Sequence, residues 1–328
     1  MSPIATMQAA YIEQAGGPIR IGPLPVPRPG PTDVLVRVAA SGVNHVDRFV
    51  LSGAYRTHTP FPFVLGRDAV GTVVQAGPGV DAFKAGERVW CNSLGHAGRQ
   101  GALAEYAVVA ADRLYRLPAA ADPLQAVAVL HTAATAHLGL ARHARLQAGE
   151  TLLLEGAGGG VGSAVLQIAR AMGVRVIATA AAADADWCRQ CGAEQVIDYH
   201  HADRYEQVSR AAPHGIDAWW DNSGRNDFAA VLPLMRLGAR IILMSGLRGA
   251  DPALPVGALY TRDITLHGFA ISNASVSELA AAAQVINRLL ATGRLQARIG
   301  ARYALADTAQ AYAAMAAGGA PGRIVITV

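Results

Sequence analysis

Lysine is almost absent from this chain of 328 residues: Lys84 is the only one, although lysine and arginine together number 28. The net charge of +4 is therefore carried almost wholly by arginine, whose planar guanidinium grips phosphate and carboxylate groups. The arginines are scattered, and no dense basic run with interleaved aromatic residues occurs. This pattern favours a small anionic ligand and makes nucleic acid an improbable partner.

Cysteine is also scarce, with Cys91, Cys188 and Cys191 only. An odd count without a secretory signal favours a reducing compartment and no disulfide framework. Cys188 and Cys191 form a lone CxxC inside the helix-like stretch "ADADWCRQCG". Structural zinc sites usually need four ligands and no second pair exists, so we interpret the two thiols as structural.

Long unbroken apolar runs are missing as well. No run of about 18 apolar residues lacks breakers, so no membrane span is expected. The first residues, "MSPIATMQAAYIEQAGGP", show no basic stretch followed by an apolar one, which argues against a secretory signal. We therefore expect a cytoplasmic protein.

What is present suits two well-buried domains, because the chain is 52% hydrophobic and only 16% charged. Residues 7 to about 120 read as short strands broken by turns, which predicts a β-rich barrel or sandwich. The proline-studded "IRIGPLPVPRPGPTD" cannot be a central strand.

From about residue 122 apolar strands alternate with amphipathic helices. The strands are "TLLLE", "VRVIATA", "QVID", "IDAWWDNSG" and "ARIILMSG", and the helices include "GSAVLQIARAMG", ending at Gly173, and "NDFAAVLPLMRLG". This alternation predicts an α/β fold with a doubly wound parallel sheet covered on both faces. We predict a first domain over 1–122, a dinucleotide-binding domain over 123–262, and a return segment, 263–328, completing the sheet and the first domain.

The turn in "TLLLEGAGGGVGSAVLQIARAMG" is the strongest local motif. A strand runs into a glycine-rich turn and then a helix, with Ala157, Gly159 and Gly162 at the three fingerprint positions. Residues without a large side chain let the backbone approach a pyrophosphate, whose charge the helix start then stabilises. The turn predicts dinucleotide binding; no Gly-Lys-Ser/Thr follows, so it is not a Walker loop.

The second strand of this domain bears on which dinucleotide is bound. An NAD site usually carries Asp or Glu at that strand's end, but "VRVIATAAAADAD" ends in Thr179 and alanines. Asp184 comes late and is expected to start the next helix. No basic residue stands there to grip a 2′-phosphate either, while Tyr199, His200 and His201 could supply polar contacts. We expect NADPH, with NADH as the less favoured alternative.

The polar run "ASGVNHVDRFVLSGAY", residues 40–55, raises a separate question. It gathers Asn44, His45, Asp47 and Tyr55 behind a strand-like segment, so it could be a metal site, a catalytic site or only a loop.

The chain as a whole resembles the zinc-independent quinone oxidoreductases of the medium-chain dehydrogenase/reductase superfamily, the zeta-crystallin-like group. The resemblance covers "GVNHVDRFVLSGAY", "PFVLGRDAVGTVVQAGPGVDAFKAGERV", "GALAEYAVV", "QAGETLLLEGAGGGVGSAVLQIARAMG" and "YALADTAQAYAAMAAGGAPGRIVITV". It implies a GroES-like β-rich domain, a Rossmann-type domain, and a homodimer or homotetramer.

The resemblance also argues against zinc. Zinc-dependent relatives carry Cys where this chain has Asn44 and His where it has Arg67, and the structural-zinc lobe here retains only Cys91. His45 and Asp47 alone are a poor site. We expect no metal and interpret the polar run as a cofactor-facing loop.

The site residues implied by the resemblance follow by position. Asn44 would hydrogen-bond the cofactor near its nicotinamide end, and Tyr55 would protonate or hydrogen-bond the developing anion, or only pack against substrate. Asp47 would orient backbone or a neighbouring side chain, and His45 and His131 would be structural or exposed. The expected cofactor-binding residues are Asn44, Thr135, Gly158, Gly159, Gly160, Val161, Gly162, Thr179, Tyr199, Ser223, Ser245, Gly246, Ala270, Ile271 and Ser272.

The activity implied is hydride transfer from NADPH to a quinone or similar electrophilic small molecule. A 2-alkenal, an enone or an enoyl thioester is the alternative acceptor. A non-catalytic NADPH-binding protein is the alternative of another class. The substrate pocket would be lined by loops such as 54–63 and 247–263.

Overall fold

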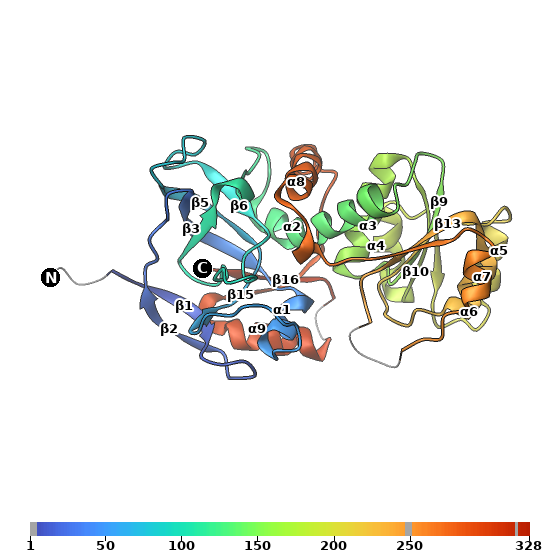
Figure 1. Ribbon diagram of the computed structural model, residues 1–328, viewed down its shortest axis with the longest axis horizontal. Helices are drawn as coiled ribbons and strands as arrows, with labels where there is room; N and C mark the ends of the chain where they lie inside the picture. Colours follow the sequence, from blue (N-terminus) through green and yellow to red (C-terminus); the bar gives the residue numbers. More distant parts are fainter. Residues whose placement is uncertain (1–4, 247–250, 319–320) are drawn as a thin grey trace. The chain divides into compact units, whose positions relative to one another are not determined.

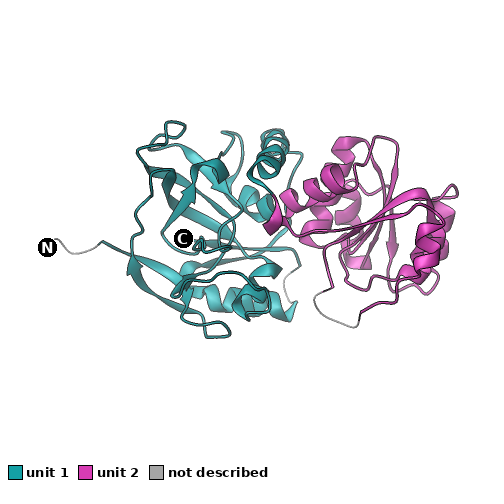
Figure 2. Cartoon of the chain, in the orientation of Figure 1, with its two compact units in different colours: residues 1–131, 275–328 teal, residues 132–274 magenta. Residues whose placement is uncertain are grey.

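The computed structural model describes residues 5–246, 251–318 and 321–328, and it divides into two compact units (Figure 1, Figure 2). Unit 1 comprises Met1–His131 and Ser275–Val328, and unit 2 comprises Thr132–Ala274. Both division points fall later in the chain than the predicted 122/123 and 262/263. The first falls inside a helix, α2 (Pro123–His137), which runs on without a break. Residues 247–250 of the predicted pocket loop lie outside the described residues.

Unit 2 is built on a six-stranded parallel sheet of order β11-β10-β9-β12-β13-β14. Numbered from β9, this is the order 3-2-1-4-5-6 of doubly wound dinucleotide-binding folds. The predicted α/β fold class is confirmed. The strands are β9 (Thr151–Glu155), β10 (Arg175–Ala180), β11 (Gln195–Asp198), β12 (Ile216–Asp221), β13 (Met235–Leu243) and β14 (Thr265–Gly268).

Helices cover both faces of this sheet (Figure 2). α3 ends at Gly173 as predicted, because Gly173 takes the left-handed conformation, φ 75°, that closes the helix. One core cluster packs Leu153, Ile177 and Trp219 against Val208 and Phe228 of two helices. The helices are α3 (Gly160–Met172), α4 (Ala185–Cys191), α5 (Arg204–Ala211), α6 (Phe228–Val231) and α7 (Val256–Tyr260).

The helix predicted over 226–238 is mostly wrong. α6 ends at Val231, a single 3₁₀ turn follows at Leu232–Leu234, and β13 already begins at Met235. Pro233 has no backbone N–H to donate and its ring clashes with the preceding turn, so the helix cannot continue through it. The chain then continues as β13, of which Met235, Ala239 and Ile241 are buried.

Unit 1 contains two sheets. A three-stranded sheet has the order β2-β1-β4, and a seven-stranded sheet has the order β15-β16-β3-β5-β6-β8, with β7 pairing with β3. The proline-rich β2 lies at a sheet edge, as its composition requires. The strands are β1 (Thr6–Ile12), β2 (Arg20–Pro25), β3 (Asp33–Gly42), β4 (Phe63–Val64), β5 (Ala69–Ala76), β6 (Arg88–Cys91), β7 (Tyr106–Ala110), β8 (Tyr115–Arg116), β15 (Ile299–Ala304) and β16 (Arg323–Thr327).

The end of the chain returns to unit 1 and is fixed there by polar contacts. β16 pairs antiparallel with β3, and Asn287 on α8 (Val276–Ala291) accepts the indole N–H of Trp90 at 2.8 Å. Tyr312 lies on α9 (Thr308–Ala317) and Arg323 begins β16. The return segment thereby brings two polar side chains to the polar run of residues 40–55.

One described segment, Pro123–His143, is long and apolar enough to cross a membrane by length and composition alone. It comprises α2 and the π-helical turn Leu138–His143. Of its most apolar window, 78% is buried inside the protein, which is how a core helix of a water-exposed fold behaves. Gly139 in this turn is required by packing, since a Cβ there would lie 2.1 Å from the Trp220 ring.

Candidate functional site

The glycine-rich turn of unit 2 lies at the carboxyl end of β9. Gly156 has φ 70°, Gly159 is the N-cap of α3, and the helix runs for 13 residues from Gly160. A Cβ on Gly162 would lie 2.5 Å from the carbonyl oxygen of Gly156, so only glycine lets α3 approach the turn this closely. The free N–H groups at the start of α3 and the open side of Gly159 fit a pyrophosphate.

The position of this turn in the sheet supports the same use. β9 lies between β10 and β12, and the strand order reverses its direction between β9 and β12. Open parallel sheets bind ligands at such a switch point, outside the carboxyl ends of the strands. The expected residues Gly158, Gly159, Gly160 and Val161 lie in this turn or at the first residues of α3.

Asp184, beyond the end of β10, lies closer to the glycine turn than the sequence suggested. Thr179 is buried within β10, and Asp184 caps α4, as expected. A Cβ on Gly158 would lie 2.4 Å from the carboxylate Oδ2 of Asp184. A carboxylate therefore adjoins the glycine turn, and its charge bears on the choice of dinucleotide.

A basic residue that sequence reasoning did not single out lies near Tyr199. The guanidinium carbon of Arg225 is 6.0 Å from the centre of the Tyr199 ring, and the centre of the His200 ring is 4.3 Å from that of Tyr199. Tyr199 follows β11 and Arg225 follows β12, so both stand at the carboxyl edge of the sheet. In the sequence, the feature that could have singled out Arg225 is its position just after the end of a predicted strand.

Glu155, the last residue of β9, is a buried carboxyl group. Its Oε2 accepts the indole N–H of Trp219 at 2.7 Å, and its Oε1 accepts the hydroxyl of Tyr205 at 3.2 Å. Burial, and then the nearby Asp221, raise the pKa of Glu155 to about 7. The group is thus held half-protonated near neutral pH, directly before the glycine turn.

Two more expected cofactor residues are brought together by Asp221 at the end of β12. The Ser245 hydroxyl donates to the carbonyl of Asp221 at 2.8 Å, and Ser223 donates its N–H to the Asp221 carboxylate. Gly246 has φ 128°, a conformation that favours glycine. Of the remaining expected residues, Thr135 is buried in α2, and Ala270, Ile271 and Ser272 lie at the 3₁₀ turn Ile271–Asn273.

In unit 1 the polar run is a helix and not the loop that was expected. α1 (His45–Leu51) has Asn44 as its N-cap, and the Asp47 carboxylate accepts the N–H of Asn44 at 2.9 Å. An acidic side chain three residues after an Asn N-cap stabilises a helix start, because it pairs with an N–H that the helix leaves free. His45 is exposed, while Asp47 is buried.

Asn44 is the centre of a buried hydrogen-bond network. Its side-chain amide donates to Asp68 Oδ2 at 2.9 Å and to the carbonyl of Gly42 at 3.3 Å, and its oxygen accepts from Arg323 at 2.7 Å. Both amide hydrogens are thus committed within unit 1. Its expected contact with the nicotinamide end of a cofactor stays a prediction, and the oxygen's second lone pair is the acceptor left for it.

Two carboxyl groups and two guanidinium groups surround Asn44. Asp47 Oδ2 also accepts the hydroxyl of Tyr312 at 3.0 Å, and its Oδ1 lies 3.9 Å from Arg67 Nε. Burial raises the pKa of Asp47 above its usual value, although the charge of Arg67 opposes the shift. Burial likewise raises the pKa of Asp68 to about 7. Asp47 here orients backbone and side chains, as interpreted from the sequence.

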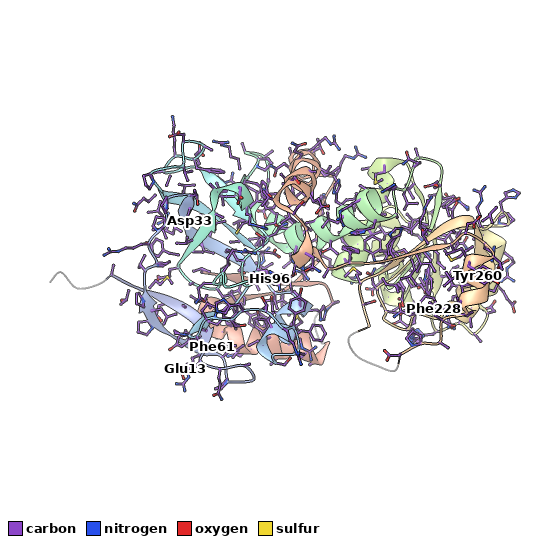
Figure 3. All side chains as sticks on the ribbon, viewed as in Figure 1. Glu13, Asp33, Phe61, His96, Phe228 and Tyr260 are labelled. Atoms are coloured by element: carbon purple, nitrogen blue, oxygen red, sulfur yellow. The ribbon has the colours of Figure 1, made fainter. Side chains whose placement is uncertain are left out.

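Tyr55 lies just after α1 and is only partly buried. Its ring packs on the cluster of Ile12, Val50 and Phe63, and it meets the His96 ring edge-on at 6.0 Å. Within the described residues its hydroxyl has no hydrogen-bond partner. The group is therefore available to a ligand. His96 follows β6 and is labelled in Figure 3.

The donor set does not suit a metal ion. Across residues 5–246, 251–318 and 321–328, no group of three or more His, Cys, Asp or Glu side chains is placed to hold one. At the positions discussed for zinc, the chain offers the amide of Asn44 and the guanidinium of Arg67. Neither is a zinc ligand, and a guanidinium repels a cation. All three cysteines are buried and unpaired with one another.

Comparison with known proteins agrees with this geometry. The family model "Alcohol dehydrogenase GroES-like domain" matches residues 30–119, and the model "Zinc-binding dehydrogenase" matches residues 160–288. The two matches correspond to the β-rich part of unit 1 and to the stretch that begins at α3. A two-domain dehydrogenase or reductase with a nicotinamide site is the class defined by this fold.

Individual relatives narrow the class. The quinone oxidoreductase of Rattus norvegicus is 32% identical over 311 residues, which is 93% of each chain. Two solved structures cover 98% of this chain and all of theirs: an NAD-dependent alcohol dehydrogenase, 30% identical with a TM-score of 0.89, and a mycobacterial protein complexed with NADPH, 28% identical with a TM-score of 0.83. The chain belongs to the quinone oxidoreductase group of the medium-chain dehydrogenase/reductase superfamily, and it is a quinone-oxidoreductase-like enzyme that uses a nicotinamide cofactor.

Proposed function

We propose that this protein is a zinc-independent NADPH:quinone oxidoreductase, acting on a quinone or a similar electrophilic small molecule. NADPH, when bound, supplies the hydride. The glycine turn at the switch point is the feature that best supports cofactor binding, with Gly156 to Gly162 and the start of α3 holding the pyrophosphate. Thr179, Tyr199, Ser223, Ser245, Gly246 and the turn 270–272 are proposed to contact the rest of the cofactor.

The residues of unit 1 are proposed to act on the acceptor. Tyr55 offers an unpaired hydroxyl to the oxygen on which negative charge develops. Asn44, fixed by Asp68 and Arg323, is proposed to accept a hydrogen bond from the cofactor's nicotinamide end. No metal is required, since Arg67 and Asn44 offer none of the ligands that zinc prefers.

NADPH is preferred to NADH in this proposal because Arg225 and His200 both lie near Tyr199, where a 2′-phosphate would gain charge-assisted hydrogen bonds. Asp184 opposes this preference, because its carboxylate adjoins Gly158 and would repel a phosphate. Arg225→Leu should raise the KM for NADPH while leaving that for NADH nearly unchanged. Asp184→Asn should lower the KM for NADPH. If Arg225→Leu left the ratio of the KM for NADPH to the KM for NADH unchanged, the assignment of the 2′-phosphate contact to Arg225 would fail.

The decisive experiment follows the loss of NADPH absorbance with three acceptors: p-benzoquinone, crotonaldehyde and a crotonyl thioester. The highest kcat/KM is expected with the quinone. A preference for crotonaldehyde or the thioester would instead assign the enzyme to the enone or thioester reductases. Tight NADPH binding without turnover on any acceptor would favour a non-catalytic binding protein.

Two properties complete the proposal. A cytoplasmic location suits three buried free thiols, which a reducing compartment maintains. A homodimer or homotetramer is expected from the family, and equilibrium sedimentation of the purified chain measures it. A mass equal to one chain at micromolar concentration would exclude that assembly.

A further inference from the structure

Arg67 is a buried cation in unit 1 with a specific set of neighbours. Its side chain is 2% exposed, and its ion pair with Asp47 has an N–O distance of 3.9 Å, longer than a hydrogen bond. The other oxygen of Asp47 is already engaged by the Asn44 N–H and the Tyr312 hydroxyl. Asp47 therefore lies at ion-pair distance from Arg67 Nε, while its other oxygen is held by hydrogen bonds.

Further positive charge gathers beside Arg67. Arg99 is half-buried and donates its Nε–H to the carbonyl of Ser93 at 3.1 Å. The charges of Arg67, Arg99 and Arg113 act together on His96; burial first, and then these three guanidinium groups, lower the pKa of His96 to about 4. His96 is therefore neutral at pH 7. Burial disfavours charge of either sign, but the three guanidinium groups would stabilise an anion at this point.

His96 lies in a loop that has several positive φ angles. Gly95, Ala97 and Gly98 all have positive φ, and Ala97 at φ 52° carries a side chain in a conformation that glycine prefers. The loop is tied down where the N–H of Ala97 donates to Thr57 Oγ1 at 2.8 Å. Strained backbone persists when neighbouring contacts enforce it, and such positions cluster at functional sites.

Tyr55 and His96 form the accessible part of this arrangement. Their rings meet at 6.0 Å and 60°, and the guanidinium carbon of Arg67 lies 5.8 Å from the centre of the Tyr55 ring. Both side chains are partly exposed, and neither Tyr55 Oη nor a ring nitrogen of His96 has a hydrogen-bond partner among the described residues. Two neutral donors thus stand next to a fixed cation.

We propose that Tyr55, His96 and Arg67 form a site for an anionic oxygen, with Tyr55 and His96 donating hydrogen bonds to it and Arg67 stabilising its charge through space. The inference rests on the proposed function, which supplies the ligand. When the acceptor gains a hydride at carbon, the displaced π pair ends on its oxygen as an enolate or phenolate. Tyr55 or water then returns the proton, and the two electrons come from the reduced nicotinamide. Arg67 is a positioning residue, since it is buried.

Negative charges near the arginines oppose the binding of an anion at this site. The carboxylates of Asp47, Asp68 and Asp112 face the arginines, and Arg323 adds a second buried cation. Because the pKa of Asp68 is raised to about 7, this carboxyl group is largely protonated in mildly acidic solution and cancels less of the positive charge. Arg67 remains the positive charge that both Tyr55 and His96 face.

The test uses para-nitrophenol, whose anion absorbs visible light, added to the full-length protein without any cofactor. The wild-type protein should bind the anion in preference to the neutral phenol and lower the probe's pKa by about one unit, as an opposite charge does. Arg67→Met should abolish that shift and weaken binding of the anion by about tenfold. A tenfold change in affinity and a shift of one pKa unit both correspond to about 1.4 kcal/mol. Arg67→Lys, which keeps the charge, should retain part of the shift.

Arg37→Met is the matched control, because Arg37 is exposed on β3 and its loss changes the net charge equally. It should bind the probe as the wild type does. Since Arg67→Met could disturb the buried network, thermal unfolding of each variant is measured alongside. If Arg67→Met does not fold, Arg99→Met and His96→Gln test the proposed anion site in its place. Both should reduce the shift.

The inference is overturned if the protein binds neutral phenol as tightly as its anion, or if folded Arg67→Met, Arg99→Met and His96→Gln all bind like the wild type. Failure of the proposed function has a different signature: no NADPH oxidation with any acceptor, together with anion binding that still depends on Arg67. The two can therefore be told apart on one set of proteins.

Discussion

At the scale of single residues, the notable feature is how many polar side chains are buried with their partners already supplied. Asn44 and Glu155 each stand at a proposed site, yet both amide hydrogens of Asn44 and both carboxyl oxygens of Glu155 are already hydrogen-bonded to the protein. Buried polar groups without partners are costly, so such networks are rigid and hold their members in one orientation. Tyr55 differs, because its hydroxyl remains available.

Tyr55→Phe tests the role of that hydroxyl. The phenyl ring should keep its packing on Ile12 and Phe63, so the melting temperature should hardly change. With crotonaldehyde as acceptor, kcat should fall by about 100-fold, the usual contribution of a positioned acid. Turnover of p-benzoquinone should fall far less, because its reduced product can take protons from water. An unchanged kcat with both acceptors would leave Tyr55 as a packing residue only.

Glu155 predicts a pH dependence of stability. With its pKa raised from 4.5 to about 7, the folded protein keeps a proton that the unfolded chain has released between these values. The free energy of unfolding therefore falls as pH rises through this window, by up to about 3 kcal/mol from this group. Urea unfolding at several pH values should show a shallower fall in Glu155→Gln.

The slope should be reduced and not abolished, since Asp68 also has a pKa raised to about 7 and contributes in the same direction. Glu194→Gln, at an exposed position, serves as the control and should leave the slope unchanged. Equal slopes in Glu155→Gln and the wild type would show that the carboxyl group at position 155 ionises in the folded protein as it does in water.

At the scale of elements, most strands and helices of unit 2 followed their sequence pattern, including the four-residue β11, whereas the helix predicted over 226–238 and the loop predicted at α1 did not. β9, α3 and β10 have the expected order, and α3 ends at Gly173 as predicted. α1 was expected as a loop, because seven residues with only a few apolar positions give little periodicity. Its stability comes from the Asn44–Asp47 pairing and from Tyr312 on α9.

The glycine turn offers a matched pair of substitutions. Gly162→Ala should destabilise unit 2 by about 1–3 kcal/mol, because the added Cβ would lie 2.5 Å from the Gly156 carbonyl oxygen. Gly159→Ala should fold normally, since its nearest atom would be 3.6 Å away. It should still weaken NADPH binding by about tenfold by obstructing the pyrophosphate. Calorimetry of unfolding and of NADPH binding measures both effects.

Equal stability of the two variants would contradict the close packing of α3 on the turn. Unchanged NADPH affinity in Gly159→Ala would move the pyrophosphate away from this residue.

At the scale of the whole molecule, the chain presents very few nucleophiles to solvent. Cys91, Cys188 and Cys191 are at most 4% exposed, burial raises the pKa of the Cys91 thiol, and Lys84 is the single lysine. An enzyme that handles electrophilic quinones benefits from this, because quinones add to thiolates and amines.

The folded protein should therefore gain almost no p-benzoquinone adducts on its cysteines during the time of an assay, whereas the chain unfolded in urea should gain three. Intact-protein mass spectrometry before and after exposure measures the number. Rapid modification of a cysteine in the folded protein would mean that unit 1 or unit 2 opens locally near that thiol.

The sequence alone determined the fold class, the dinucleotide turn and the poor match to a metal site, because each depends on local spacing: strand, glycine turn and helix follow one another within about twenty residues. It could not reveal Tyr312 or Arg323 as partners of α1, since they lie 265 and 279 residues away from Asp47 and Asn44. The proximity of Asp184 to Gly158, of Arg225 to Tyr199 and of Arg67 to Tyr55 was likewise decided by tertiary structure. The contacts in unit 2 arise where separate strands end at one sheet edge, and those of Tyr312 and Arg323 arise where the returning chain packs in unit 1. No periodicity in the sequence encodes neighbours of this kind.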